Sequence, residues 1–260
     1  MNQSLIDELG DELYLALASS SAVDPLTSRV TDMSLEDAYR VQQRLLARRL
    51  EQGERAVGWK IGATSRRAME LMKVDQPNFG VLTDRMLVKS GDCIDRTTLV
   101  MPMAEGEIAF LLQDDLAGPG VTAADVLRAT KGVMACFEII DSRVRNWQIR
   151  IQDSVADNSS SGLFVLGEQW VDPQQVDLVN CAMTLEKNGA VVGTGVGGNC
   201  LDSPANAVAW LANALGQEGT GLKAGEVILS GALSGVVPVA AGDELSVSIE
   251  GLGNCRVRFA

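Results

Sequence analysis

AEGEIAFLL (residues 104–112) and ACFEIIDSR (residues 135–143) are two apolar runs, typical of buried strands, that each carry glutamate. Glu105 and Glu107 lie in the first run, and Glu138 lies in the second. Residues two apart on a strand point to the same face, about 7 Å apart along the chain. A buried carboxylate is costly unless a positive charge meets it. The two runs therefore predict a pair of strands whose three carboxylates converge on a cation.

The chain contains no histidine, so a metal here would be held mainly by oxygen. Oxygen ligands favour a hard cation such as Mg²⁺ or Mn²⁺. The alternative is that one face of each strand is simply solvated. Because no basic residue stands directly beside Glu105, Glu107 or Glu138 in the sequence and Glu138 is embedded in an apolar stretch, the metal interpretation is favoured. The absence of histidine also excludes hydrolysis by a serine or cysteine that a histidine activates.

Composition limits the classes of protein to consider. Hydrophobic residues make up 46% and charged residues 22% of the 260 residues, as in soluble globular proteins. No apolar run reaches the roughly 18 residues of a membrane span, and a net charge of −12 argues against nucleic acid as a partner. The five cysteines are scattered without a CxxC pair, and the N-terminus is acidic where a signal peptide is basic. We therefore expect a cytoplasmic protein.

The pattern of apolar residues divides the chain into two parts. Residues 1–56 are expected to be helical, with Leu5, Leu9 and Leu13 at helical spacing and a second helix that begins at Ser34 and stops near Gly53. Residues 57–260 alternate short apolar runs with turn residues, which predicts a β-rich domain. Its hairpins are expected at 182–196, around Asn188-Gly189, and at 245–259.

Two further helices are expected within the β-rich part, so the fold class is α+β with a mixed, largely antiparallel sheet. One helix should begin at Thr122. The other should run from Ser203 through Pro204 to a stop at Gly216. GTGVGG (residues 193–198) does not lead directly into a helix and lacks a surrounding βαβ unit. It is interpreted as a flexible turn rather than a phosphate-binding loop.

Two other stretches carry residues suited to chemistry. Lys60 lies in GWKIGATS (residues 58–65) between apolar and glycine neighbours, where a lysine is usually paired or functional, although a surface lysine is the alternative. DNSSSG (residues 157–162) offers five successive side chains that can bond a polar ligand, although such clusters are often only turns. Arg143 could balance Asp141 or bind a substrate carboxylate, and the balancing role is preferred.

Taken in order, the motifs resemble the hydratase and decarboxylase branch of the fumarylacetoacetate hydrolase superfamily. The resemblance covers nearly the whole chain, and the segments that carry it are PLTSR, SLEDAY, GWKIGATS, VDQPNFG, EGEIAFLL, EIIDSR, DNSSSG and AGEVILSGAL.

The resemblance implies a β-roll fold, usually oligomeric, with Mg²⁺ or Mn²⁺ on Glu105, Glu107 and Glu138. It places Lys60 and Ser160 as catalytic residues, and its substrate pocket takes in Asp157, Asn158, Ser160 and Ser161 as well as Lys60. The implied activity is addition of water to 2-hydroxypenta-2,4-dienoate in the meta-cleavage degradation of aromatic compounds. The alternatives are decarboxylation of 2-oxohex-3-enedioate and, less favoured, a non-catalytic scaffold. A complex with the pathway decarboxylase is also implied.

The chain departs from the family pattern at two positions. Asn78 stands where the family usually has aspartate, so no general-base role is assigned to it. Ser159 stands where the family's polar loop often has alanine, which adds a hydroxyl that can form a hydrogen bond.

Overall fold

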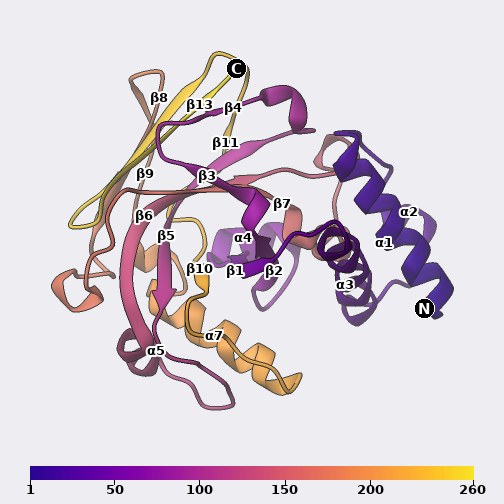
Figure 1. Cartoon of the computed structure of the whole chain (residues 1–260), viewed down its shortest axis with the longest axis horizontal. Coiled ribbons are helices and arrows are strands. Elements are labelled where there is room, and N and C mark those ends of the chain that lie inside the picture. Colours follow the sequence, from indigo (N-terminus) through magenta and orange to yellow (C-terminus); the bar gives the residue numbers. More distant parts are fainter.

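The computed structural model describes all 260 residues and has two sheets flanked by helices (Figure 1). The helices are α1 (Gln3–Ala18), α2 (Leu26–Arg29), α3 (Leu35–Glu51), α4 (Arg66–Met72), α5 (Ala123–Ala129), α6 (Ile151–Ala156) and α7 (Pro204–Gln217). The strands are β1 (Ala56–Gly62), β2 (Asn78–Thr83), β3 (Leu87–Lys89), β4 (Cys93–Ile94), β5 (Met103–Leu112), β6 (Thr130–Ile140), β7 (Ser161–Leu166), β8 (Ala182–Lys187), β9 (Ala190–Val196), β10 (Val227–Leu229), β11 (Val237–Pro238), β12 (Glu244–Ile249) and β13 (Gly253–Phe259). None of the helices is long and apolar enough to cross a membrane.

The first three helices form the expected N-terminal helical segment. Ser34 and Asp37 make a reciprocal capping box at the start of α3, which satisfies backbone N–H groups that the first helical turn leaves free. The apolar faces of α1 and α3 pack together with α6 in one buried cluster. The helical segment is therefore held against the β-rich part, in which α6 directly precedes the DNSSSG stretch.

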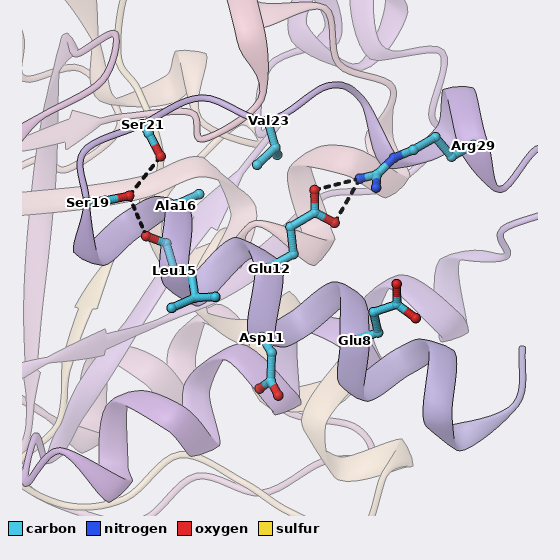
Figure 2. Close-up of a pocket in the computed structure, with 9 residues that line it drawn as sticks. All are labelled: Glu8, Asp11, Glu12, Leu15, Ala16, Ser19, Ser21, Val23 and Arg29. Carbon is cyan, nitrogen blue, oxygen red and sulfur yellow. Dashed lines mark hydrogen bonds and ion pairs between the residues drawn. The ribbon is translucent and has the colours of Figure 1, made fainter.

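A hollow of about 630 Å³ lies along α1 (Figure 2). Its lining is rich in acids, but Glu12 pairs with Arg29 at 3.0 Å and Asp11 pairs with Arg44 at 2.8 Å. The charges of Glu12 and Asp11 are therefore balanced, whereas Glu8, the third acid of the lining, has no ion pair. The hollow does not include any of the candidate catalytic, metal-binding or substrate-binding residues.

The large sheet has eight strands in the order β2-β1-β10-β5-β6-β7-β3, and β11 pairs with β5. Only β1 with β10 and β3 with β7 run parallel, so the prediction of a mixed, largely antiparallel roll is confirmed. The small sheet has the order β4-β13-β12-β8-β9 and includes both predicted hairpins. The main hydrophobic core of 40 buried residues lies on the face of the large sheet that carries Phe110 and Phe137.

Two local predictions from glycine are wrong. Helix α7 does not stop at Gly216 but continues to Gln217, and the left-handed residue is Gly219 (φ 74°). A Cβ on Gly216 would lie 2.6 Å from the Gly118 carbonyl oxygen, so this glycine permits close packing rather than a turn.

The GTGVGG stretch is not a turn throughout, because Gly193–Val196 belongs to strand β9. A Cβ on Gly195 would lie 2.0 Å from the Leu233 carbonyl oxygen. The glycines therefore let the segment before β11 lie directly against the strand.

Candidate metal centre

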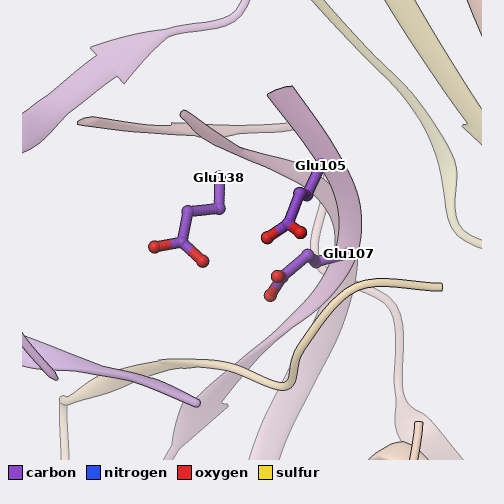
Figure 3. A group of neighbouring side chains, drawn as sticks. All are labelled: Glu105, Glu107 and Glu138. Carbon is purple, nitrogen blue, oxygen red and sulfur yellow. The ribbon is translucent and has the colours of Figure 1, made fainter. Parts of the chain in front are cut away.

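Strands β5 and β6 bring the three glutamates together. Glu105 is the cross-strand partner of Glu138, and Glu107 lies two residues further on the same face. Each residue offers a carboxylate oxygen within 4.8 Å of the other two (Figure 3). Glu107 and Glu138 are completely buried, and Glu105 is partly buried. The sequence prediction that these carboxylates converge is confirmed.

The protein leaves part of this oxygen cluster without hydrogen bonds. Glu107 Oε2 accepts from the Gly231 amide at 2.8 Å, but Glu107 Oε1 and Glu138 Oε2 have no partner. Buried carboxylate oxygens normally find donors, because an unmet one costs its full desolvation. Converging oxygen ligands with unmet lone pairs fit a hard divalent cation.

The electrostatics of the glutamate cluster also favour a bound cation. Burial, followed by the charge of Glu138, raises the pKa of Glu105 to about 7. Burial also raises the pKa of Glu107 well above its usual range, and Glu138 adds to this effect. Burial raises the pKa of Glu138 as well, although Lys60 opposes it. The three carboxylates thus resist ionising together without a positive charge between them.

Lys60 is a member of this cluster and not a surface lysine. Only 3% of the residue is exposed, and Nζ lies 3.1 Å from Glu138 Oε1. It also donates to the carbonyl oxygen of Ser159 at 3.1 Å. Burial alone would lower the pKa of Lys60, but the attraction of Glu138 and its neighbours outweighs burial and raises it. One lysine against three ionised glutamates leaves a formal charge of −2, which a divalent cation balances.

The DNSSSG stretch approaches Lys60 through an unusual backbone. Asn158, Ser159 and Ser160 are consecutive non-glycine residues with φ between 54° and 56°. Such left-handed residues cost of order 1 kcal/mol or more each, and they tend to occur where function requires them. Sequence reasoning did not find this strain. The left-handed backbone of these three residues directs the Ser159 carbonyl toward Lys60.

The polar side chains of this stretch have different environments. Asn158 exchanges hydrogen bonds of 2.8 and 2.9 Å with the backbone of Val81. Ser160 Oγ lies 3.1 Å from Ser154 Oγ. Ser161 Oγ is buried without a partner. Of these groups, only the Ser161 hydroxyl is left with its hydrogen-bonding capacity unused by the protein.

Asp157 is engaged by Arg143 in a buried ion pair. Arg143 Nε and the Arg143 backbone amide reach its two carboxylate oxygens at 2.6 and 2.8 Å. Burial raises the pKa of Asp157 to about 6, and Arg143 opposes this rise. Arg143 therefore has a balancing role, as expected, but its partner is Asp157 rather than the Asp141 carboxylate. The Asp141 side chain instead accepts from the backbone amides of residues 100 and 101.

Asn78 closes the site on the side of β2. It is buried and pairs across the sheet with Gly62, and its Oδ1 accepts a short hydrogen bond from Ser159 Oγ. A Cβ on Gly62 would lie 2.7 Å from Asn78 Oδ1 and 3.4 Å from Lys60 Nζ. The absent side chain of Gly62 thus leaves room where these polar groups meet.

The rest of this face of the large sheet is apolar. Leu229 lies beside Lys60, Cys136 beside Glu107 and Phe164 beside Glu138. They belong to a small buried cluster on the carboxylate face: Leu82, Met86, Ala109, Met134, Cys136, Phe164 and Leu229. A ligand at the carboxylates would meet polar groups at one end and hydrocarbon around them.

Comparison with known proteins supports the resemblance seen in the sequence. The family model described as fumarylacetoacetate (FAA) hydrolase C-terminal matches residues 51–260. The chain is 56% identical over 220 residues to 2-hydroxypent-2,4-dienoate hydratase of Pseudomonas putida, covering 84% of this chain and 99% of that protein. It is 49% identical over 260 residues to 2-hydroxyhexa-2,4-dienoate hydratase of Comamonas testosteroni, covering 99% and 98%.

Solved structures give the same fold. 4-Oxalocrotonate decarboxylase from Pseudomonas putida G7, complexed with magnesium and adipate, superposes with a TM-score of 0.97 at 35% identity, covering 100% of this chain and 99% of that one. The same enzyme complexed with calcium and acetate gives a TM-score of 0.96 at 34% identity, with the same coverage.

Proposed function

Because the chain belongs to the fumarylacetoacetate hydrolase family, we propose that it is a metal-dependent hydratase that adds water to 2-hydroxypenta-2,4-dienoate to give 4-hydroxy-2-oxopentanoate. Two relatives at 56% and 49% identity carry hydratase names for dienoates of this kind. The observation that carries the proposal is the buried cluster of three glutamates with oxygens that the protein leaves unmet. This reaction belongs to the meta-cleavage degradation of aromatic compounds.

Glu105, Glu107 and Glu138 would hold the divalent cation, which we propose to be Mg²⁺ or Mn²⁺. Their all-oxygen donor set suits these ions better than a softer metal. When bound, the cation supplies a Lewis acid that draws electron density from the C2 oxygen of the substrate. The Gly231 amide at 2.8 Å holds the Glu107 carboxylate in orientation.

Lys60 is the proposed proton carrier of the site. Its ammonium lies beside Glu138 and is held by the Ser159 carbonyl, so it can donate to the carboxylate or the C2 oxygen of a substrate at the cluster. A proton must reach the carbon skeleton during ketonisation, and a positioned acid–base group typically contributes about 10²- to 10⁴-fold to such a step. Asn78 carries an amide, which cannot serve as a base.

The remaining proposed site residues come from the DNSSSG stretch. Ser161 offers a free buried hydroxyl for direct contact with substrate, and Ser160 is proposed to assist catalysis next to it. Asp157 and Asn158 are proposed to contribute by shaping the pocket, because their side chains are occupied by Arg143 and Val81.

The charges around the cluster favour a substrate with a single carboxylate. Lys60 is the cation at the cluster and is already paired with Glu138, and Arg143 is committed to Asp157. The neighbouring face is apolar. A diacid such as 2-oxohex-3-enedioate would need a further cation for its second carboxylate. Decarboxylation of that diacid is the second candidate function, because the decarboxylase structure superposes over the whole chain.

One experiment separates these functions. Purified protein with Mg²⁺ is incubated with 2-hydroxypenta-2,4-dienoate and, separately, with 2-oxohex-3-enedioate. We expect 4-hydroxy-2-oxopentanoate from the first substrate and little CO₂ from the second. Release of CO₂ without water addition would establish the decarboxylase instead, and turnover of neither substrate would favour a non-catalytic scaffold. Exhaustive chelation should abolish turnover, and Mg²⁺ or Mn²⁺ should restore it.

We also propose that the chain self-associates and that it can contact the decarboxylase of its pathway. A homo-oligomer should give a light-scattering mass that is a multiple of 27.6 kDa. A clean monomer at micromolar concentration would contradict self-association but would leave the hydratase assignment in place.

A further inference from the structure

Asn78 lies on the same face of the large sheet as the metal centre. In the register of β1 and β2, Lys60 is opposite Gly80 and Gly62 is opposite Asn78. Because residues two apart on a strand point to one face, all four share a face. Lys60 contacts Glu138 from this face, so the Asn78 side chain is on the side of the sheet that carries the carboxylates.

Two glycines on this face let the loop that follows α6 lie directly against β2. A Cβ on Gly80 would lie 2.4 Å from the Asn158 carbonyl oxygen. A Cβ on Gly62 would lie 3.3 Å from Ser159 Oγ and 2.7 Å from Asn78 Oδ1. Without these side chains Ser159 reaches Asn78, and its hydroxyl donates to Asn78 Oδ1. Both residues are at least 95% buried, so water does not compete for this hydrogen bond.

The hydrogen bond from Ser159 fixes which way the Asn78 amide faces. An amide side chain has one acceptor oxygen and two N–H donors, and Ser159 occupies the oxygen. A Cβ on Gly62 would also lie 3.4 Å from Lys60 Nζ, so the ammonium is close to the same point. Its positive charge favours the amide oxygen over the N–H groups on that side. The N–H groups of Asn78 therefore face away from Ser159 and have no partner in the protein.

Other asparagines of the chain use both ends of their amides. Asn158 exchanges two hydrogen bonds with the backbone of Val81, and Asn213 exchanges two with the backbone of Val121. Asn78 differs because only its oxygen is bonded. A buried donor without a partner is rare, since it loses its hydration without compensation. An unused donor on the face of the metal centre indicates a group that meets the ligand.

The position of Asn78 indicates which ligand atom it meets. Strands β1 and β10 lie between β2 and β5, so Lys60 on β1 is closer to the glutamates in the sheet order than Asn78 is. The proposed substrate carries its oxygens at C1 and C2, and these are the atoms assigned to the metal and to Lys60. The one oxygen farther along the carbon chain is the oxygen that water brings to C4.

We propose that Asn78 and Ser159 form a subsite for the C4 oxygen. Asn78 donates an N–H hydrogen bond to that oxygen, and Ser159 is a positioning residue that holds the amide in the required orientation. The inference rests on the proposed hydratase function and deepens it. A neutral donor suits this place, because it holds an oxygen without removing its proton and adds no charge beside three carboxylates.

The test compares two ligands that differ in this oxygen alone. 4-Hydroxy-2-oxopentanoate has it, and 2-oxopentanoate lacks it. Calorimetric titration at saturating Mg²⁺ measures the Kd of each. Wild-type protein should bind the hydroxy compound about 3- to 10-fold more tightly, which is the effect of one neutral hydrogen bond. Asn78→Leu and Asn78→Ala should each reduce this preference to none and leave the affinity for 2-oxopentanoate largely unchanged.

Ser159→Ala tests the positioning role separately. It removes the hydroxyl but keeps the backbone carbonyl that accepts from Lys60. The preference for the hydroxy compound should fall part of the way, and combining the change with Asn78→Leu should lower it no further than Asn78→Leu alone. Asn213→Ala on α7 is the matched control, because it also removes a half-buried amide and two hydrogen bonds. It should lose stability but keep the wild-type preference.

Three results would overturn the inference: no preference in the wild type, a wild-type preference in both Asn78 variants, or an equal loss of affinity for both ligands in those variants. The last would make Asn78 structural. If the wild type still hydrates 2-hydroxypenta-2,4-dienoate, the hydratase assignment survives such a result. If the wild type neither hydrates the dienoate nor binds either ligand, the proposed function fails and this inference fails with it.

Discussion

Two groups of buried charges both contact the DNSSSG stretch, one through Lys60 and one through Arg143, and they differ in how the protein satisfies them. Arg143 and Asp157 are almost completely buried, and the guanidinium also donates to the carbonyl oxygens of Asp157 and Ser161 at 2.7 and 3.0 Å. The glutamate cluster has a single lysine, and two of its oxygens have no partner. The first group is complete within the chain, whereas the second is completed by a ligand.

This difference separates structural charges from functional ones better than burial does. Burial raises the pKa of Asp157 and of the glutamates alike. What distinguishes them is the number of donors that the fold supplies. A buried ion pair with all its hydrogen bonds met is expensive to break but is not required for binding anything. An incomplete cluster is expected to lose function, rather than stability, when it is altered.

The largest expected effect is on the complete pair. Arg143→Met should lower the free energy of unfolding by about 3–5 kcal/mol, because it leaves Asp157 as a buried and unpaired carboxylate. Urea denaturation checks this value. The matched control is Arg145→Met, whose exposed pair with Asp24 should contribute less than about 1 kcal/mol. Equal effects of the two variants would show that the Arg143–Asp157 pair is no more structural than a surface pair.

The second-largest expected effect is a loss of metal affinity. Glu107→Gln should weaken Mg²⁺ or Mn²⁺ binding by more than about 10²-fold, since even residues that only orient metal ligands are worth about 10- to 100-fold. Calorimetric titration measures the affinity, and circular dichroism should show the wild-type fold. Glu244→Gln, at an exposed position on β12, is the control and should bind metal normally. Unchanged affinity in Glu107→Gln would remove this residue from the metal centre.

Lys60→Met tests whether the lysine is a structural charge, as Arg143 is, or a functional part of the glutamate cluster. The change keeps bulk and removes the ammonium, and it should lower kcat/KM by about 10²-fold or more at saturating metal. The three proposed metal ligands are untouched, so the metal should still bind. Wild-type kcat/KM would show that the lysine takes no part in proton transfer. Loss of both metal binding and folding would instead make it a counter-charge of Glu138.

Local signals in the sequence predicted much of the fold. The helix start at Ser34, the Asn188-Gly189 hairpin and the period-two spacing of Glu105 and Glu107 depend on neighbours in the chain, and all three are confirmed. Gly216 misled because glycine serves close packing as well as helix ends.

Long-range relations were less accessible. Lys60 and Glu138 are 78 positions apart in the chain. They lie on β1 and β6, with β10 and β5 between them, and no local pattern encodes their pairing. The three left-handed residues after Asp157 were also missed, because they are held by contacts with Val81, Lys60 and the Asp141 amide rather than by glycine.

The smallest expected effect concerns single hydroxyl groups. Ser161 Oγ is buried without a partner, so Ser161→Ala should leave the free energy of unfolding unchanged or slightly higher, while KM rises by about 5- to 10-fold if the hydroxyl bonds substrate. Ser142→Ala is the matched control, because the buried Ser142 Oγ already accepts from the Val144 amide at 3.1 Å. It should cost about 1 kcal/mol of stability and leave KM unchanged. Denaturation and steady-state kinetics on both variants give the comparison. If Ser161→Ala is destabilised like Ser142→Ala and keeps its KM, the free hydroxyl is structural, and unmet hydrogen bonds would not by themselves identify the substrate pocket.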